Sequence, residues 1–453
     1  MKIRLIYIIL IFFSFNTWAQ DTLNFKTVDA TSYQAYINKD WKTVIRIGNQ
    51  ALKQKIDYYY LRMRLGIAYF EKKNYRKSIV HFEKAMSMNN QEVVATEYLY
   101  YAYKNIGDDI QAVKTLEKSD TKFANKLFLK QTIFQNIYAF YSTRIYENSK
   151  LKDASLPAYQ SEVEIQKKPI YVEQYIPESY SNYQLGTTVR LSPSWRLDGS
   201  FQYFSTQKEQ YILDPINETS KTSNVSQNQW HINNTFRLSN RLKASVFFSY
   251  LSQKYNYISI KSNQVPVSYE EIQNGKSSNL LLGLGLSTQQ NYYDLEWSAS
   301  FFSNTTAPIL QSNLSLKIFP FGNRALFTES GISLLKADST APKPIFSQSI
   351  TYSPHERISL SLTGNWGEMQ NWNTNNAYVI YNGIYNLTEI YQTQITARIY
   401  KGLYAKLYYQ YLSNTSDIFS KSLFPSNSED TPQVIDNTKF NTHSIIGGLI
   451  WEF

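Results

Sequence analysis

The last ten residues of the chain read SIIGGLIWEF (Ser444–Phe453) and contain a regular alternation. Apolar or small residues occupy every second position: Ile445, Gly447, Leu449, Trp451 and Phe453. A two-residue period places successive side chains on opposite faces of a strand, so this segment predicts a β-strand with one apolar face. The same alternation recurs at 196–203, 242–250 and 358–366. From about residue 132 onward the chain therefore predicts antiparallel β structure.

Alternation alone fits a soluble sandwich as well as a barrel, and the composition favours the barrel. Aromatic residues make up 16% of the 453 residues, with 38 Tyr among them, whereas charged residues make up only 18%. Barrels in outer membranes need aromatic girdles at both lipid interfaces and a polar lumen. The mean hydropathy of −0.41 excludes a polytopic helical membrane protein, because each of its helices would need roughly 20 consecutive apolar residues.

The connections between the predicted strands differ in length, and this supports the prediction of a barrel. Tight turns are predicted near 192–194, 239–240, 290–291, 322–323, 354–356 and 401–402. Long polar loops are predicted near 147–179, 207–226, 255–277, 338–343, 368–387 and 415–440, with a shorter one near 304–307. Short periplasmic turns and long outer loops are typical of outer-membrane barrels. The pattern predicts about 14 transmembrane strands within residues 132–453, with both barrel termini on the periplasmic side.

The terminal strand also resembles the C-terminal signal of outer-membrane proteins, in which alternate apolar residues lead to a terminal Phe. Leu449, Trp451 and Phe453 carry this resemblance. It implies insertion into the outer membrane and a lumen lined by the other strand face. Phe247, Leu281 and Phe327 are predicted to point inward, which favours a partly filled lumen.

A 34-residue period precedes the strands. The clearest copy of the repeat spans Leu65 to Ala85 and has large and small residues at fixed positions. The next copy, 34 residues later, begins at Leu99 and has a similar pattern. The predicted packing residues are Leu65, Gly66, Tyr69, Ser78, Phe82, Ala85, Leu99, Tyr103, Ala112 and Leu116. The pattern resembles the tetratricopeptide repeat, which pairs antiparallel helices around small residues. The resemblance implies a helical domain at 20–131 that docks a protein partner; the alternative is a spacer or a barrel cap without a partner.

The first 19 residues are typical of a secretory signal peptide. A basic start at Lys2 and Arg4 leads into an apolar core, and Thr17-Trp18-Ala19 offers a cleavage site. The basic character of the mature chain is concentrated in residues 20–130, with 19 Lys and Arg against 12 Asp and Glu. We therefore expect a secreted protein whose helical domain lies in the periplasm.

The sequence predicts no catalytic, cofactor-binding or metal-binding residues. The chain has no Cys and four scattered His, which excludes disulfides and thiolate zinc sites. His231 beside Asn233 is the one lumen-facing candidate for a base, and a hydrogen-bonded wall residue is the better interpretation. Asp294 and Glu296 share a strand face, as solvated lumen charges do.

A partly basic ring is predicted inside the lumen near the short turns. Its members are Arg190, Arg196, Arg237, Lys243, Arg398 and Lys406, with Asp198 and Glu452 as counter-charges. The functional hypothesis is anion preference or guidance of an acidic polymer. The structural hypothesis is a network of salt bridges that braces the lumen.

Two functions remain open at this point. The first is an outer-membrane channel or export pore whose repeat domain recruits a periplasmic protein partner or cargo. This layout is similar to that of exopolysaccharide export porins, which place tetratricopeptide repeats before a barrel. The second is a non-conducting subunit that anchors a cell-envelope assembly. Outer-membrane lipid and an anionic polymer are further expected partners, and no nucleic acid is expected.

Overall fold

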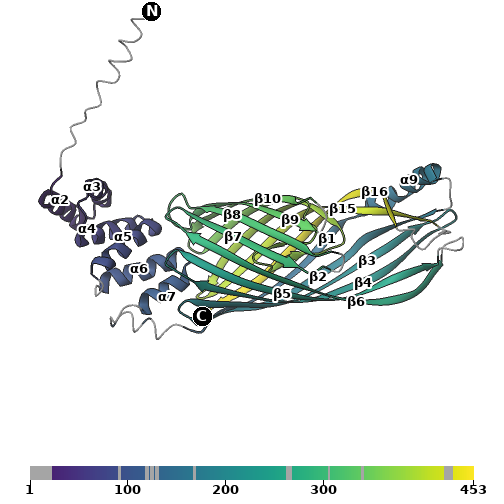
Figure 1. Cartoon of the computed structure of the whole chain (residues 1–453), viewed down its shortest axis with the longest axis horizontal. Coiled ribbons are helices and arrows are strands. Elements are labelled where there is room, and N and C mark those ends of the chain that lie inside the picture. Colours follow the sequence, from purple (N-terminus) through teal and green to yellow (C-terminus); the bar gives the residue numbers. More distant parts are fainter. Residues whose placement is uncertain are drawn as a thin grey trace, which may run out of the picture.

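The computed structural model describes residues 23–89, 93–117, 122, 127, 132–166, 170–261, 268–304, 307–337, 341–422 and 432–453. The predicted signal peptide lies outside these residues. The described chain has two parts, a group of helices and a long β-barrel, arranged end to end (Figure 1). The predicted fold class, an N-terminal helical region followed by an antiparallel barrel, is confirmed.

The described part of the helical domain has six consecutive helices: α2 (Phe25–Ile37), α3 (Trp41–Lys53), α4 (Tyr59–Glu71), α5 (Tyr75–Met88), α6 (Val93–Asn105) and α7 (Asp109–Glu117). Side chains cap the starts of four of them, since Asn24, Asp40, Asn74 and Asp108 accept hydrogen bonds from the backbone N–H three residues later. Each helix packs on the next, and α4 also contacts α2 and α6. This is the arrangement of stacked helix pairs.

Two glycines permit the close approach of these helices. A Cβ on Gly66 would lie 2.7 Å from the Phe82 ring, and one on Gly48 would lie 2.6 Å from Leu65. Ser78 Oγ donates to Gly66 O at 2.9 Å across the same contact. All ten residues that the repeat pattern singles out for packing are buried in this domain.

Fourteen antiparallel strands form one closed barrel. They are β1 (Phe134–Glu147), β2 (Ile170–Ser192), β3 (Trp195–Leu213), β4 (Glu218–Arg237), β5 (Leu242–Lys261), β6 (Ser268–Gln289), β7 (Tyr293–Phe302), β8 (Ile309–Ile318), β9 (Leu326–Ala337), β10 (Lys343–His355), β11 (Ile358–Gly367), β14 (Asn386–Tyr400), β15 (Leu403–Ser422) and β16 (Gln433–Glu452). The last strand closes the ring, because β16 pairs with both β15 and β1, with Leu449 opposite Ala139.

The outward face of the barrel is apolar over a limited height. Leu282, Leu284 and Leu286 of β6 are exposed, and Leu360 and Leu362 of β11 are exposed in the same way. Exposed aromatic residues lie near the ends of this band: Trp195, Tyr293, Tyr352 and Trp451 at one end, and Trp230, Phe301, Phe346 and Trp366 at the other. An aliphatic band between two aromatic girdles is the outer surface of a barrel in a lipid bilayer. Among the described helices, none combines the length and apolar character needed to span a membrane.

The predicted loops at 207–226 and 255–277 are wrong, because most of these residues belong to long strands. Strand β3 continues to Leu213, β4 begins at Glu218, and β5 continues to Lys261. Their outer parts lie beyond the apolar band, where both strand faces are free to be polar, so the sequence shows no alternation. The predicted loop at 147–179 likewise contains a helix, α9 (Ser149–Gln166), and the first part of β2.

Half of the barrel wall is therefore much taller than the other half. Strands β2 to β6, β15 and β16 extend past the ends of β7 to β11, as the teal and yellow arrows show (Figure 1). At this tall end β15 pairs with β2, from Ile418 opposite Gln174 to Ser422 opposite Ile170. We call the end with the tall strands the far end, and the opposite end, against the helical domain, the near mouth.

The predicted loop at 368–387 contains a small hairpin of its own. Strands β12 (Trp372–Thr374) and β13 (Val379–Tyr381) pair only with each other. Their residues contact the inner wall of the barrel through hydrogen bonds. We call residues 368–385 the lumen hairpin.

Candidate functional site

A cavity of about 2270 Å³ occupies the barrel. At the near mouth it is lined by Lys104 of the helical domain and Arg324, and at the far end by Lys208 and Lys276. Tyr378 of the lumen hairpin lines it between these ends. The hollow thus runs along the barrel from one end to the other, past the hairpin.

The lumen hairpin is fastened to the wall by neutral groups. Ala377 O accepts a hydrogen bond from Ser249 Oγ at 2.9 Å, and Tyr378 O accepts one from Gln202 Nε2 at 2.9 Å. Asn373 exchanges hydrogen bonds with Gln311, with Gln311 Nε2 to Asn373 O at 2.7 Å. The one ion pair of the hairpin among the described residues joins Glu368 at its start to Lys343, and both side chains are exposed. Releasing the hairpin from the wall contacts above therefore leaves no buried charge behind.

Apolar contacts hold the hairpin on two sides. Ala377 packs against the inward Phe247 and Leu281, two residues that the sequence placed in the lumen. Trp372 packs in a second cluster with Leu335 and Ile345. Phe327, the third residue predicted to point inward, lines the open cavity.

The tip of the hairpin has a strained backbone. Asn375, Asn376 and Ala377 have φ values of 51°, 55° and 66°. Asn tolerates this left-handed region, whereas Ala there costs roughly 1–2 kcal/mol. Such strain persists where surrounding contacts enforce it, and it is common at functional constrictions.

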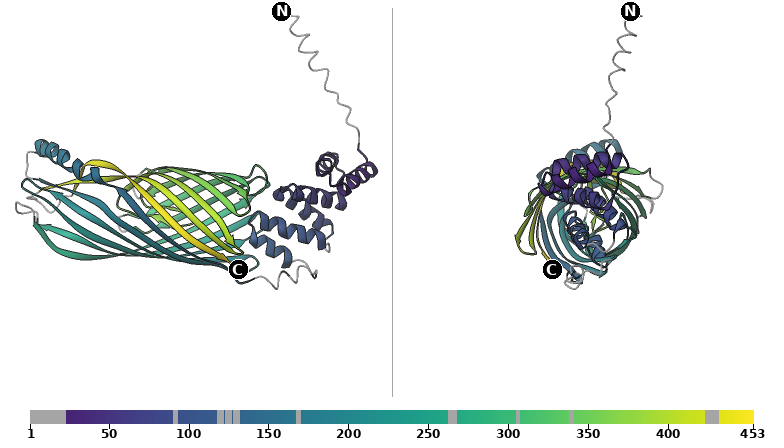
Figure 2. Two further views of the ribbon diagram at one scale, coloured as in Figure 1. Left: turned by 180° about the vertical axis from the view of Figure 1, so that it is seen from behind. Right: turned by 90° about the vertical axis from the view of Figure 1, so that its left-hand side faces the viewer.

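The helical domain is fixed to the near mouth by charged groups, and it lies across the end of the barrel (Figure 2). Asp108, which precedes α7, is 1% exposed and contacts two cations of the barrel wall. Arg237 Nη2 donates to Asp108 Oδ2, and Lys243 Nζ lies 3.3 Å from Asp108 Oδ1. The same carboxylate caps its helix by accepting from Gln111 N at 3.3 Å.

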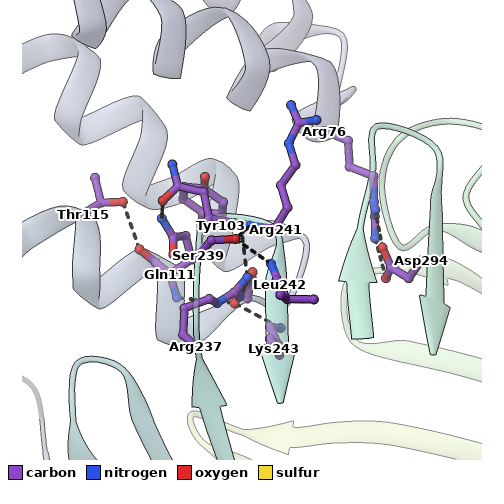
Figure 3. A network of polar contacts seen from close by, with 12 residues as sticks. Arg76, Tyr103, Gln111, Thr115, Arg237, Ser239, Arg241, Leu242, Lys243 and Asp294 are labelled. Atoms are coloured by element: carbon purple, nitrogen blue, oxygen red, sulfur yellow. Dashed lines mark hydrogen bonds and ion pairs between the residues drawn. The ribbon is translucent and has the colours of Figure 1, made fainter. Parts of the chain in front are cut away.

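A second buried ion pair lies beside the first (Figure 3). Arg76 of α5 donates to both carboxylate oxygens of Asp294, at 2.7 and 2.9 Å, and to Gln290 O at 2.6 Å. Its guanidinium also lies 3.8 Å from the centre of the Phe319 ring. Bidentate arginine–carboxylate pairs fix orientation as well as distance. We call Asp108, Arg76 and their partners the clamp.

Polar contacts between turns complete the clamp. Gln111 Nε2 donates to Asn240 Oδ1 at 3.2 Å, and Asn240 Nδ2 donates to Glu83 Oε1 at 2.7 Å. Asn323 Nδ2 donates to Lys73 O at 2.9 Å. Gly107 has a φ of 76°, which disfavours any residue with a side chain, and it lies directly against the guanidinium of Arg324.

Burial and neighbouring charges shift the pKa of Asp108 in opposite directions. Burial raises the pKa of this carboxyl, but the charges of Lys243 and Arg237 outweigh it and hold the pKa below its ordinary value of 3.8. A depressed carboxyl pKa stabilises the folded state above the unfolded pKa, and this stabilisation is lost as pH falls through the folded pKa. The carboxylate of Asp108 is therefore ionised at neutral pH.

The six cations of the predicted basic ring fall into separate groups. Arg237 and Lys243 are paired with Asp108, and Arg196 Nε lies 3.2 Å from Asp198. Arg190 Nη2 donates to Thr132 O at 2.9 Å. Only Arg398 and Lys406 of the six line the cavity. Anion preference from these two residues remains a prediction.

His231 is held in the wall beneath the hairpin. Its Nδ1 lies 2.9 Å from Ser249 Oγ, and its ring packs against Tyr378 at a centroid distance of 5.8 Å. Of the two carboxylates singled out in β7, Asp294 belongs to the clamp, whereas Glu296 lines the cavity. Within the described residues, no group of three or more His, Cys, Asp or Glu is arranged to hold a metal ion.

Sequence reasoning missed Asp108 and Arg76. The run Gly107-Asp108-Asp109 has the form of a turn followed by a helix cap, but no local pattern indicates that Asp108 would be buried against a barrel turn. Arg76 lies within the repeat as an ordinary helix residue. Both partners are more than a hundred residues away in sequence.

No protein-family model matches the chain, and no curated protein matches it significantly. Among solved structures, the Pseudomonas putida toluene transporter TodX is 9% identical with a TM-score of 0.44, covering 72% of this chain and 91% of that one. The translocator domain of the autotransporter NalP from Neisseria meningitidis is 9% identical with a TM-score of 0.31, covering 79% and 98%. A MamA mutant is 19% identical over 23% of this chain and 58% of its own, with a TM-score of 0.20. Function must therefore be argued from the geometry of this chain.

Proposed function

We propose that the protein is an outer-membrane pore for small polar solutes, constricted by the lumen hairpin and framed at its periplasmic mouth by the helical domain. The observation that carries this proposal is the cavity of about 2270 Å³, which is lined by residues from the near mouth through to the far end. Its lining is dominated by Gln, Asn, Ser, Thr and Tyr, which suit a hydrated path.

The orientation follows from barrel architecture. Both ends of the barrel chain, at Phe134 and Phe453, lie at the near mouth, together with the short turns. Outer-membrane barrels have short turns on the periplasmic side and long extensions outside. The tall strands and α9 would then face the cell exterior, and the helical domain would face the periplasm.

The size of the path favours small solutes. The lumen hairpin occupies the middle of the barrel, with Ala377 and Tyr378 bonded to β3, β4 and β5. A polymer or an unfolded protein would require this hairpin to leave. Because its anchors are neutral, such movement is less costly than breaking a buried ion pair.

The alternative is a non-conducting anchor, and the same hairpin favours it. Two apolar clusters and several hydrogen bonds fix the hairpin in place. If the hairpin never moved and the remaining gaps held only ordered water, the barrel would serve as an attachment point.

Conductance of the full mature chain in planar bilayers separates these functions. We expect steady ion conductance for the wild type and several-fold larger conductance when residues 370–382 are replaced by a short Gly-Ser linker. The matched control is a disulfide between S249C and A377C, positions whose side chain and backbone are in contact. The chain has no Cys, so no other thiol interferes.

The outcomes differ clearly. A conducting wild type and a larger conductance after hairpin replacement support the pore. A folded wild type that is silent, together with a conducting replacement variant, would assign the closed state to the hairpin and favour the anchor. Equal conductance in oxidised and reduced S249C/A377C would indicate that the path passes the hairpin without moving it.

We further propose that the helical domain binds a periplasmic protein partner. Support comes from exposed aromatic side chains at the part of the domain away from the clamp, Phe25, Tyr33 and Tyr60. A photo-crosslinking residue at Tyr60 should capture a defined partner in cells, whereas one at the buried Tyr103 should not. Equal labelling at both positions would argue against a specific surface.

A further inference from the structure

One arginine of the lumen wall differs from the cations of the clamp. Arg144 lies on β1 and lines the cavity. Its guanidinium carbon is 3.9 Å from the centre of the Tyr180 ring, which covers one face of the cation. Its Nε is buried, and no described group accepts a hydrogen bond from it.

No carboxylate of the described residues lies within ion-pair distance of Arg144. Several other cations of the barrel have such partners: Arg196 pairs with Asp198, Arg237 with Asp108, Lys317 with Glu329 and Lys421 with Glu173. The polar groups beside this buried guanidinium are the phenols of Tyr180, Tyr146 and Tyr381, and Tyr146 forms a side-chain hydrogen bond with it. A guanidinium in this setting is costly unless an anion is supplied.

The same patch of wall holds further polar groups without partners. Strands β1 and β2 are in register there, with Ser142 opposite Asn182 and Phe140 opposite Gln184. Gln184 Nε2 and Asn182 Oδ1 are buried and have no hydrogen-bond partner among the described groups, and both residues line the cavity. Along the inward face of this strand pair, the rung of Asn182 is thus the next one from Arg144, and the amide donor of Gln184 lies one rung further toward the near mouth.

We propose that Arg144 is the anchor of an anion-binding site in the lumen, and that its ligand is a carboxylate group of the permeating solute. A planar guanidinium matches the two oxygens of a carboxylate. The patch offers one cation surrounded by neutral phenols and amides, so it balances one negative charge. A phosphate, which carries nearly two charges at neutral pH, is matched less well.

This inference deepens the proposed pore, because it names the solute class that the lumen favours. It differs from the predicted basic ring, of which Arg144 is not a member. Tyr381 belongs to β13 of the lumen hairpin, so the site lies where the hairpin narrows the path. Solute binding there would take place at the constriction itself.

The test is calorimetric titration of the full mature protein in detergent with potassium acetate, and separately with potassium phosphate. We expect saturable acetate binding in the wild type and about tenfold weaker binding in R144Q. R144K keeps the charge but loses the planar fork, and we expect intermediate binding. K276Q is the matched control, because it removes one charge from the same cavity on β6, away from β1, and should bind acetate as the wild type does.

Binding is measured without conductance, so failure of the pore and failure of the site are distinguishable. A silent barrel that binds acetate through Arg144 would refute the pore and retain the site. Equal losses in R144Q and K276Q would reduce the effect to general lumen charge and overturn the inference. Tighter binding of phosphate than of acetate would overturn the assigned ligand class, and unchanged binding in R144Q would overturn the site.

Discussion

The clamp and the lumen hairpin both join a separate element to the barrel wall, but they use different chemistry. In the clamp, buried charges meet: Asp108 with Arg237 and Lys243, and Arg76 with Asp294. In the hairpin, backbone carbonyls meet Ser and Gln side chains. Breaking a buried ion pair leaves uncompensated charges, whereas breaking neutral hydrogen bonds costs far less. The comparison indicates a permanent joint at the near mouth and a displaceable element in the lumen.

The largest effect is expected for D108N. It leaves Arg237 and Lys243 without their counter-charge, and removing one member of a buried pair typically costs 3–5 kcal/mol. We expect the helical domain to detach, measured as faster limited proteolysis of α7 while the barrel stays intact. The matched control is D109N at the next residue, where Asp109 is exposed and its pair with Lys104 is worth less than about 1 kcal/mol. Similar proteolysis of the two variants would contradict a permanent joint at Asp108.

The second-largest effect is expected from breaking the ion pair between Arg76 and Asp294, which lowers the stability of the helical domain. The variants R76Q and D294N and the double variant test it. Since the pair is bidentate and Arg76 is buried, we expect a coupling free energy of about 2–3 kcal/mol. Stability of the helical domain against urea, followed by proteolysis, provides the measurement. Additive effects of the two single changes would mean that Asp294 is not the group that holds Arg76.

The third-largest effect is a dependence of the stability of the helical domain on pH. Burial, followed by the charges of Arg62 and Lys77, lowers the pKa of His81 from 6.5 to about 3. The folded state keeps this imidazole neutral while the unfolded state takes up a proton, so stability falls as pH drops from 6.5 toward 3. From pH 7 to pH 5 the loss should be about 2 kcal/mol.

H81Q serves as the comparison for this pH dependence, because Gln has no ionisable group and can still accept from Arg62, which lies 3.1 Å from His81 Nδ1. Urea unfolding of the helical domain at pH 7 and at pH 5 should show the loss in the wild type and little of it in H81Q. An equal loss in both proteins would assign the pH dependence to other groups.

The smallest expected effect is a gain of stability in A377G. Glycine adopts positive φ without strain, so the hairpin tip should gain about 1 kcal/mol, less the added freedom of Gly in the unfolded chain. Slower hydrogen exchange at the hairpin amides would measure it. A377V, which adds bulk at a buried left-handed position, should accelerate the exchange, and no difference between the two variants would show that the tip is not strained.

The N-terminal helices and the strand period could be predicted because both are local patterns. Leu65, Gly66 and Phe82 stand at spacings that match one helix pair, and their burial follows from that spacing. Within the apolar band, alternation predicts the strands because one face meets lipid. Beyond the band this signal disappears, which is why 207–226 was wrongly predicted as a loop although β3 and β4 continue through most of it.

The amino-acid sequence by itself determined the two-part layout, the strand count and the turns, since each depends on neighbours within a few tens of residues. The tertiary structure alone decided which charges are paired and which are free. Arg237 and Arg144 are both inward arginines of a barrel strand. Asp108 from the helical domain neutralises Arg237, whereas Arg144 lies against the ring of Tyr180 and has no carboxylate of the described residues within ion-pair distance. Their difference arises because the energy of a buried charge depends on groups that folding brings to it from distant parts of the chain.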